Sequence, residues 1–296
     1  MKRATKETTA GRRYLDLQRE ARRTGRLTDE LIQLYALECF LDRLTHSNYA
    51  EEFVLKGGVL LAAFEARRPT RDIDLSADAL DNDVASLLGI ARDIAAMKLD
   101  DGLLFDPEDA TAETIREEDG YSGVRITIGG TLSRAVVRMN VDVNVGDPIW
   151  PAPQKVRVPR LLGGALVVRG YPLEMVLAEK ILTAIARGTA NTRWRDFVDV
   201  YSLVRRHSID GETFRKALLR VAEHRDVTLV SLKVVLSGYA AIAQQRWQAW
   251  LKKQRIESRI PSAFSDVLDV VVLFADPAIA GELTATAWDP VEQRWT

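Results

Sequence analysis

The chain has 296 residues, a formal net charge of −1 and 47% hydrophobic residues, enough apolar material for a substantial core. Its balanced charge argues against a generally basic nucleic-acid-binding protein, and its single cysteine, Cys39, excludes a disulfide framework and a cysteine-based zinc site. It has no apolar run of transmembrane length and no secretory signal, so we expect a cytoplasmic protein without membrane association.

The charged residues are unevenly distributed along the chain. Residues 71–119 hold fifteen acids and four bases, whereas residues 1–30 and residues 187–225 each hold nine bases and five acids. This asymmetry predicts basic surfaces apart from an acidic site, and such surfaces suit the phosphates of a nucleic acid. The alternative is that these stretches form ordinary solvated helix faces.

Hydrophobic periodicity and capping signals predict the elements of the N-terminal half. We expect helices over residues 11–27, 28–46 and 83–97, a helix that opens within residues 53–65, and strands over residues 72–77, 123–132 and 135–145. The acidic, broken stretch between them, residues 98–122, is expected to be rich in loops. In the last strand apolar and polar residues alternate, which places Asp142 at the centre of the polar face.

The second half of the sequence is predicted to be helical. Pro151 and Pro153 open a turn-rich connector that ends near Pro172, and the expected helices cover residues 172–187, 192–206, 211–224, 228–257 and 262–275. The predicted fold class is mixed α/β, and within it the α+β type. A lobe with a small mixed sheet covers residues 1–160, and an α-helical lobe that completes the cleft covers residues 161–296.

The segment Asp72-Ile-Asp74 carries the strongest chemical signal. On a strand, both carboxylates project to one side while Ile73 enters the core. Two like charges this close are costly unless a cation lies between them, and Mg²⁺ favours a few carboxylates together with phosphate oxygens. Asp142, on another strand, would supply a third carboxylate. The alternative is three exposed or salt-bridged aspartates.

The glycine pair Gly57-Gly58 follows an apolar run and precedes another. This pattern predicts a turn that opens a helix, where backbone N–H groups bind phosphate and Lys56 adds a positive charge. The segment is not a P-loop, because the required Gly-x4-Gly-Lys-Ser/Thr pattern is absent. A glycine-mediated kink or close packing is the alternative.

Lys180 falls on the apolar stripe of its predicted helix. A lysine at such a position needs an acidic partner or an anionic ligand. Asp196 and Asp199 lie about one turn apart on the next helix and could orient Lys180, the metal site or the substrate. The alternatives are a lysine that reaches solvent at the helix edge and a purely structural network of ion pairs.

Taken together, these segments resemble the AbiEii/AbiGii-type nucleotidyltransferase toxins, within the DNA polymerase β-like superfamily. The resemblance depends on Lys56-Gly-Gly, on Arg68-Pro-Thr-Arg-Asp-Ile-Asp-Leu75 and on Val141-Asp-Val-Asn-Val-Gly-Asp-Pro148. It continues through residues 171–180 and 193–203, so that it spans roughly residues 30–205 in family order. The residues after 206 contribute no motif.

The resemblance implies a polymerase β-like core and the toxin of a type IV toxin–antitoxin pair. Such a toxin is a Mg²⁺-dependent nucleotidyltransferase that moves a nucleoside monophosphate from an NTP to RNA, here most similar to members that modify the 3′ end of tRNA and block aminoacylation. By position, Gly57 and Gly58 would hold the triphosphate, and Lys180 would contact it. Asp72 and Asp74 would bind Mg²⁺, and Asp196 would match a late acidic motif.

The resemblance also implies a separately encoded antitoxin and a regulatory site. The superfamily's usual Gly-Ser is Gly-Gly here, so that backbone groups must bind phosphate. Some family members are silenced by phosphorylation beside the metal motif, which makes Thr70 a candidate phosphosite and Ser76 a second position on the same strand. The alternatives are an enzyme that modifies a protein or a small molecule such as an aminoglycoside, and a non-catalytic nucleotide-binding partner protein.

Overall fold

A computed structural model describes residues 5–77, 80, 82–116 and 122–296. The chain divides into two units, the first formed by Met1–Asp147 with Pro153–Tyr171 and the second by Pro148–Ala152 with Pro172–Thr296. Residues 153–171 belong to the first unit because they supply two strands of its sheet.

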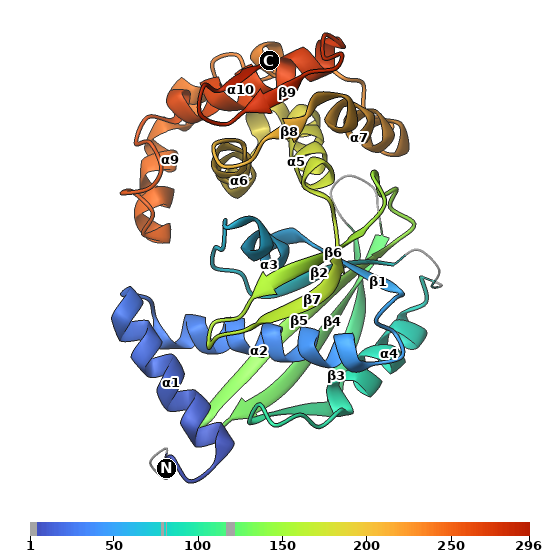
Figure 1. Ribbon diagram of the computed structural model, residues 1–296, viewed down its shortest axis with the longest axis vertical. Helices are drawn as coiled ribbons and strands as arrows, with labels where there is room; N and C mark the ends of the chain where they lie inside the picture. Colours follow the sequence, from blue (N-terminus) through green and yellow to red (C-terminus); the bar gives the residue numbers. More distant parts are fainter. Residues whose placement is uncertain (1–4, 78–79, 81, 117–121) are drawn as a thin grey trace. The chain divides into compact units, whose positions relative to one another are not determined.

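The first unit is a mixed sheet with helices (Figure 1). Its helices are α1 (Thr9–Thr24), α2 (Thr28–His46), α3 (Gly57–Leu60), the 3₁₀ helix η1 (Leu61–Phe64) and α4 (Val84–Ala96). Its strands are β1 (Phe53–Lys56), β2 (Asp72–Ala77), β3 (Leu103–Arg116), β4 (Ser122–Leu132), β5 (Ala135–Val145), β6 (Gln154–Pro159) and β7 (Ala165–Gly170).

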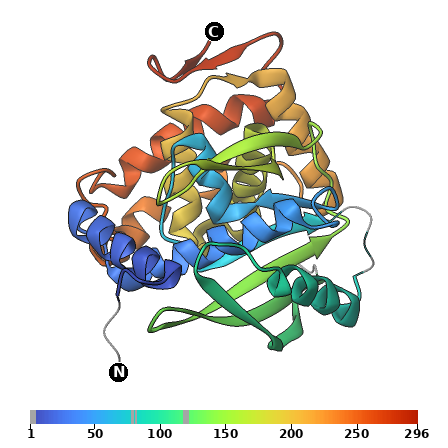
Figure 2. The ribbon, with the colours of Figure 1, turned by 60° about the horizontal axis from the view of Figure 1, so that its bottom comes forward.

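The seven strands lie in the order β3-β4-β5-β2-β1-β7-β6. β2 pairs with β5 in parallel, as does β1 with β7, and the other neighbours are antiparallel, so the predicted mixed sheet is confirmed. The long strands β3, β4 and β5 run side by side (Figure 2). β2 and β1, which hold the candidate site residues, therefore lie in the middle of the sheet rather than at an edge.

The expectation of a loop-rich stretch over residues 98–122 is wrong for its described part. β3 is a strand of 14 residues at the edge of the sheet, with an irregularity between Asp106 and Thr111. An edge strand exposes much of its surface, so it accommodates acidic residues such as Glu113 that a central strand would not. The turn-rich connector expected before Pro172 is likewise largely the β6–β7 hairpin.

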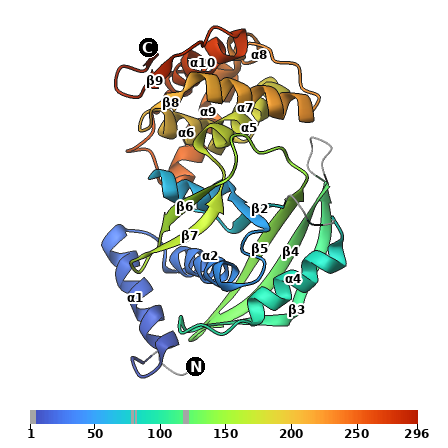
Figure 3. The same ribbon diagram turned by 45° about the vertical axis from the view of Figure 1, so that its right-hand side comes forward.

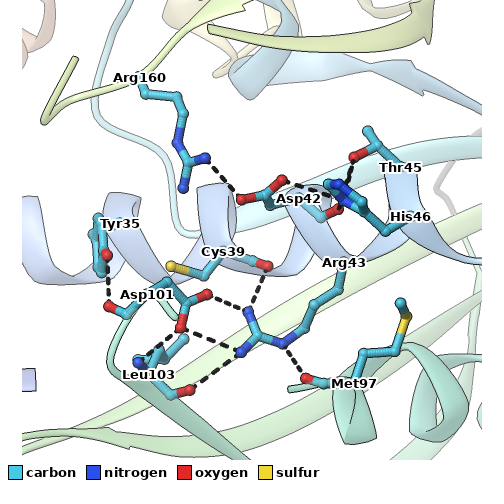
Figure 4. Close-up of polar contacts among 10 residues, drawn as sticks. All are labelled: Tyr35, Cys39, Asp42, Arg43, Thr45, His46, Met97, Asp101, Leu103 and Arg160. Atoms are coloured by element: carbon cyan, nitrogen blue, oxygen red, sulfur yellow. Dashed lines mark hydrogen bonds and ion pairs between the residues drawn. The ribbon is translucent and has the colours of Figure 1, made fainter. Parts of the chain in front are cut away.

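α2 packs against several other elements of the first unit. It contacts β5, β7 and α4, and α2 and α4 lie on one face of the sheet (Figure 3). Inside this layer, the buried guanidinium of Arg43 donates to the carboxylate of Asp101 and to the backbone oxygens of Cys39, Met97 and Leu103 (Figure 4). These partners offset the cost of removing the charge from water, and they connect α2 to the start of β3.

The second unit is mainly helical, as expected. Its elements are α5 (Leu173–Arg187), the 3₁₀ helix η2 (Gly188–Ala190), α6 (Trp194–Val204), α7 (Gly211–His224), α8 (Leu232–Val235), α9 (Tyr239–Gln254), α10 (Phe264–Ala280) and the short strands β8 (Ile209–Asp210), β9 (Ala287–Asp289) and β10 (Arg294–Trp295). The single helix expected over residues 228–257 is wrong, because Gly238, at a φ of +74°, separates α8 from α9. Buried aromatic side chains such as Trp247, Phe264 and Phe274 fill the core between the helices. No described helix has both the length and the apolar character that crossing a bilayer requires.

Candidate active site

The glycine pair lies at the junction of β1 and α3. β1 ends at Lys56, Gly57 adopts a left-handed backbone conformation with a φ of +65°, and α3 begins at once. A Cβ built on Gly57 would overlap the carboxylate of Asp74 and lie 2.7 Å from the Asp74 Cβ, so that only glycine fits here. The Gly58 N–H donates a hydrogen bond to Asp74 Oδ2 at 3.3 Å. The turn and the carboxylate are therefore packed against each other.

The Asp72-Ile-Asp74 segment is part of β2. Ile73 and Leu75 are buried in the core, whereas Asp72 and Asp74 are only partly buried. Asp72 Oδ1 accepts a hydrogen bond from Asn140 Nδ2 at 2.9 Å. The strand thus presents both carboxylates on one face and keeps the apolar residues on the other.

The strand register places four charged residues in one row across the sheet. Asp74 on β2 lies opposite Asp142 on β5, and Lys56 on β1 lies opposite Asp74 on its other side. Arg125 on β4 lies opposite Asp142. Two adjacent carboxylates are consequently flanked by two cations on neighbouring strands.

Arg125, which the sequence analysis missed, holds the carboxylate of Asp142. Its Nε and Nη2 donate to the two carboxylate oxygens at 2.8 and 2.7 Å, a bidentate arrangement. These hydrogen bonds raise the pKa of the Arg125 guanidinium. The signal was present in the alternation of Arg125 and Thr127 on the preceding strand, but only the register shows which residue they face.

Asp74 is the carboxyl group of this site whose pKa is shifted from its ordinary value. Burial raises its pKa to about 6, and the negative charge of Asp142 adds to the increase. The positive charge of Lys56 and the Gly58 N–H act in the opposite direction without cancelling it. Neighbouring positive charge therefore compensates the ionised form of Asp74 only in part, a deficit that a bound cation would relieve.

Lys56 makes its own buried ion pair. Its Nζ donates to Asp147 Oδ2 at 2.7 Å, and the ammonium lies 5.8 Å from the centre of the Tyr171 ring. The sequence predicted Lys56 as a nucleotide-binding residue. The structure places its ammonium on Asp147, from where its charge also acts on Asp74.

The expected metal ligands are Asp72, Asp74 and Asp142. They lie on the paired strands β2 and β5, but their carboxylates have different hydrogen-bond partners. Within the described ranges of the chain, no group of three His, Cys, Asp or Glu side chains is arranged to hold a metal ion. Arg125 engages Asp142, and Asn140 engages Asp72. Asp72 and Asp74 together nevertheless present carboxylate oxygens on one face, and this donor set suits a divalent cation that takes its remaining ligands from phosphate and water.

Thr70 and Ser76, which flank the two aspartates, have different surroundings. Thr70 is 9% exposed and lies against the glycine turn, because a Cβ built on Gly58 would come within 2.9 Å of its Oγ1. Ser76 is fully buried, and its hydroxyl has no hydrogen-bond partner among the described residues. Of the two, only Thr70 borders the turn.

Lys180 lies between two carboxylates in the second unit. Its Nζ donates to Asp196 Oδ1 at 2.9 Å and to Asp199 Oδ2 at 2.8 Å, and its side chain is 11% exposed. Arg193 adds a further contact to Asp196, with its Nε 3.2 Å from Oδ2. The Lys180 side chain is thus mostly buried, and its ammonium is paired with both carboxylates. The structure brings together one set of site residues in each unit: Lys56, Gly57, Gly58, Thr70, Asp72, Asp74 and Asp142 in the first, and Lys180, Asp196 and Asp199 in the second.

Comparison with known proteins identifies the family. No curated protein sequence matches the chain. Among solved structures, JHP933 from Helicobacter pylori aligns with a TM-score of 0.48 and 11% identity, over 83% of this chain and 91% of that one. A crystal structure of a candidate nucleotidyltransferase from H. pylori aligns with a TM-score of 0.47 and 12% identity, over 86% and 96%. The family model of the nucleotidyl transferase AbiEii toxin, type IV toxin–antitoxin system, matches residues 39–270, and the chain therefore belongs to the AbiEii nucleotidyltransferase toxins.

Proposed function

We propose that this toxin transfers a nucleoside monophosphate from an NTP to the 3′ end of tRNA, which blocks aminoacylation and hence translation. The observation that carries the proposal is the packing of Asp74 against the Gly57 turn. This contact puts the carboxylate pair beside backbone N–H groups, the combination that a metal-bound triphosphate requires. Action on tRNA would place the toxin in the cytoplasm.

In the proposed reaction, a hydroxyl of the RNA end attacks the α-phosphorus of the NTP. A new P–O bond forms to the RNA, and the proton of the attacking hydroxyl passes to solvent. The bond from the α-phosphorus to the β-phosphate oxygen breaks, and pyrophosphate leaves with that electron pair. Asp72 and Asp74 would hold Mg²⁺, which supplies positive charge to the phosphates and favours the ionised acceptor hydroxyl. Asp142 would join as a third ligand when its carboxylate is released from Arg125.

The remaining site residues receive roles consistent with their contacts. The backbone of Gly57 and Gly58 would bind triphosphate oxygens, and Lys56 would contribute its charge while paired with Asp147. For Lys180 and Asp196 we propose a catalytic role. The Lys180 ammonium would interact with the triphosphate, and Asp196 would keep that ammonium in position.

Membership of a type IV toxin family implies a cognate antitoxin, and Thr70 is our proposed point of control. A phosphate on Thr70 would add about −1.5 to −2 charges beside Gly58, where the triphosphate is proposed to bind. We expect Thr70→Glu to abolish nucleotide transfer and Thr70→Ser to preserve it. A normal transfer rate for Thr70→Glu would contradict this role.

The decisive experiment incubates the pure protein with Mg²⁺, total tRNA and each of the four α-labelled NTPs in turn. A parallel reaction replaces tRNA with total protein, which tests the alternative acceptor. We expect label on the tRNA 3′ end and none with Asp72→Ala or Asp74→Ala of unchanged circular dichroism. Label on protein alone would reject RNA as the acceptor, and full activity of Asp72→Ala would reject the metal assignment.

A further inference from the structure

Several cations of the two stretches that the sequence marked as basic are paired with nearby acids. On α1, Arg19 pairs with Asp16, and Arg23 pairs with Glu20 at 2.6 Å. Pairs with this spacing leave little free positive charge for a nucleic acid. The cationic surface of α1 is therefore weaker than its composition suggests.

The same holds for the stretch of residues 187–225. Lys216 pairs with Glu212 on α7, and Arg193 contacts Asp196 at the start of α6. Arg225 lies 3.5 Å from the carboxylate of Glu179. The counts of bases in the sequence thus overstate the free charge on both stretches.

Helix α9 differs, because it contains no acidic residue. Arg246, Lys252 and Lys253 lie within it, and Arg255 forms its C-cap. All four side chains are exposed, and none has an ion pair or a side-chain hydrogen bond in the described part of the chain. Helix α9 therefore carries exposed cations that no acid on the same helix opposes.

Two of these cations share a face of α9 with a tryptophan. Residues four and three positions apart lie on one side of a helix, so Arg246, Trp250 and Lys253 form one face. The helix packs on the core through another side, which includes the buried Trp247. Trp250 is half-buried and stacks on Trp247, with ring centres 5.5 Å apart.

Trp194, the first residue of α6, extends this face. Its ring lies edge-on to that of Trp250 at 6.1 Å, and its Nε1 donates to the Tyr239 hydroxyl at 3.0 Å. Trp194 is also half-buried and stands two residues before Asp196, the partner of Lys180. The two exposed cations thus flank a pair of partly exposed indoles next to a proposed catalytic residue of the same unit.

We propose that Arg246, Trp250 and Lys253 of α9, with Trp194 of α6, form the surface that binds RNA; we name this surface the α9 face. The proposal rests on the proposed function, in which RNA is the acceptor. Arg246 and Lys253 bind backbone phosphates, whose charge is not opposed by any acid on the helix. The indoles contact unpaired bases, as aromatic side chains beside basic residues do in single-strand binding. An unpaired 3′ end next to a stem supplies both features.

The test compares two double variants of the full chain in binding to a fluorescein-labelled tRNA transcript. Arg246→Gln/Lys253→Gln removes the two cations of the α9 face. The matched control, Lys252→Gln/Arg255→Gln, removes the same charge from other sides of the helix end, and glutamine maintains helix propensity. Anisotropy is measured over a series of salt concentrations, and the Kd for NTP is measured separately.

We expect Arg246→Gln/Lys253→Gln to weaken tRNA binding by about tenfold or more and to reduce the salt-dependence slope by about two. In the control, tRNA affinity should fall by a several-fold smaller factor. Neither double variant should change the Kd for NTP. Trp250→Phe should retain affinity, whereas Trp250→Leu should lose about tenfold with an unchanged slope. These results would support the α9 face.

Equal losses of tRNA affinity in the two double variants would overturn the assignment of RNA binding to the α9 face. Positive charge anywhere on the helix would then explain binding. Unchanged binding by Arg246→Gln/Lys253→Gln, while the wild type still labels tRNA, would overturn the face and leave the proposed function standing. A wild-type protein that neither binds nor labels tRNA would reject the proposed function itself. If the cognate antitoxin, and not tRNA, loses affinity for this variant, the surface binds protein and the proposal is wrong.

Discussion

The carboxylate of Asp74 occupies the space into which any side chain on Gly57 would project. A Cβ on Gly57 would lie 2.7 Å from the Cβ of Asp74 and overlap its carboxyl group, while the neighbouring Gly58 N–H donates to that group at 3.3 Å. The proposed triphosphate turn and the proposed metal ligand are thus set by one contact, and a change in either residue displaces the other.

Replacement of Gly57 by alanine tests this contact, and Gly25 provides the matched control. Both glycines have a left-handed backbone, with φ of +65° and +67°, but a Cβ on Gly25 meets no atom within 4 Å. Gly25→Ala should cost about 1 kcal/mol of unfolding free energy and leave transfer unchanged. Gly57→Ala should cost about 1–3 kcal/mol more and reduce the transfer rate at least tenfold, because Asp74 must move. Urea unfolding measures the unfolding free energy, and the tRNA-labelling rate measures transfer. Equal losses in Gly57→Ala and Gly25→Ala would contradict the contact between Gly57 and Asp74.

The raised pKa of Asp74 predicts a pH-dependent stability. The folded-state pKa is about 6, above the ordinary value of 3.8, so the folded protein binds the proton more tightly. Below about pH 4 both states are protonated and the group has no effect on stability. Between pH 4 and pH 6 ionisation costs the folded state progressively more, and the cost reaches at most about 3 kcal/mol above pH 6.

Asp74→Asn should remove this cost. Its unfolding free energy relative to wild type should increase from pH 4.5 to pH 7.5, as measured by urea denaturation without metal. Added Mg²⁺ should stabilise the wild type at pH 7.5 and not the variant. A difference between variant and wild type that stays constant with pH would refute the assigned shift.

Arg125→Gln tests whether Arg125 limits access to Asp142. Loss of the bidentate hydrogen bonds frees a third carboxylate beside Asp74, so the affinity for Mg²⁺ should increase several-fold in calorimetric titration. Arg125→Gln/Asp142→Asn should return the affinity to the wild-type value or below it. If Arg125→Gln binds Mg²⁺ no better than wild type, Asp142 is not a latent ligand.

Gly58→Ser and Thr70→Ala should compensate each other. A Cβ on Gly58 would lie 2.9 Å from Thr70 Oγ1 and 3.0 Å from its Cβ, so Gly58→Ser alone should cost about 1–3 kcal/mol. Thr70→Ala removes the Oγ1 contact and keeps the Cβ contact, so the double variant should be about 1 kcal/mol more stable than the sum of the single effects. A double-mutant cycle by urea unfolding measures this coupling, and strict additivity would show that the two residues do not compete for space.

Lys180→Met separates the structural role of Lys180 from its catalytic one. Removal of the ammonium leaves Asp196 and Asp199 as buried carboxylates without this partner, which should cost about 3 kcal/mol. Asp199→Asn in the same chain should restore much of the stability, because it removes a buried charge. Transfer activity should remain absent in both variants, and its recovery in the double variant would show that Lys180 is only structural.

The alternation of residues predicted the central strand of the site because it depends on local geometry alone. Asp72 and Asp74 flank a buried Ile73, as a strand of period two requires. β3 was missed because its acids suggest a loop, and only its place at the sheet edge makes them compatible with a strand. Composition does not specify which strand will be at an edge.

The partners of the charged residues could not be predicted from the sequence for a related reason. Lys56 and Asp147 are 91 residues apart and meet only through strand order, whereas Arg125 and Asp142 meet through the register of the neighbouring strands β4 and β5. The Lys180 pairs were closer to prediction, because α5 and α6 are consecutive helices. The exposure of the α9 cations likewise became apparent only from the structure.

The parallel pairing of β2 with β5 has a consequence for when this toxin becomes active. Asp72 and its partner Asn140 are 68 residues apart, and α4, β3 and β4 lie between them in the chain. Contacts of such long range form after the local ones, because the intervening chain must first close into a loop. A nascent or truncated chain that ends before β5 has both aspartates of β2 but not the strand that aligns them. On the ribosome, the ability to transfer a nucleotide therefore arises only after most of the first unit has been synthesised and folded.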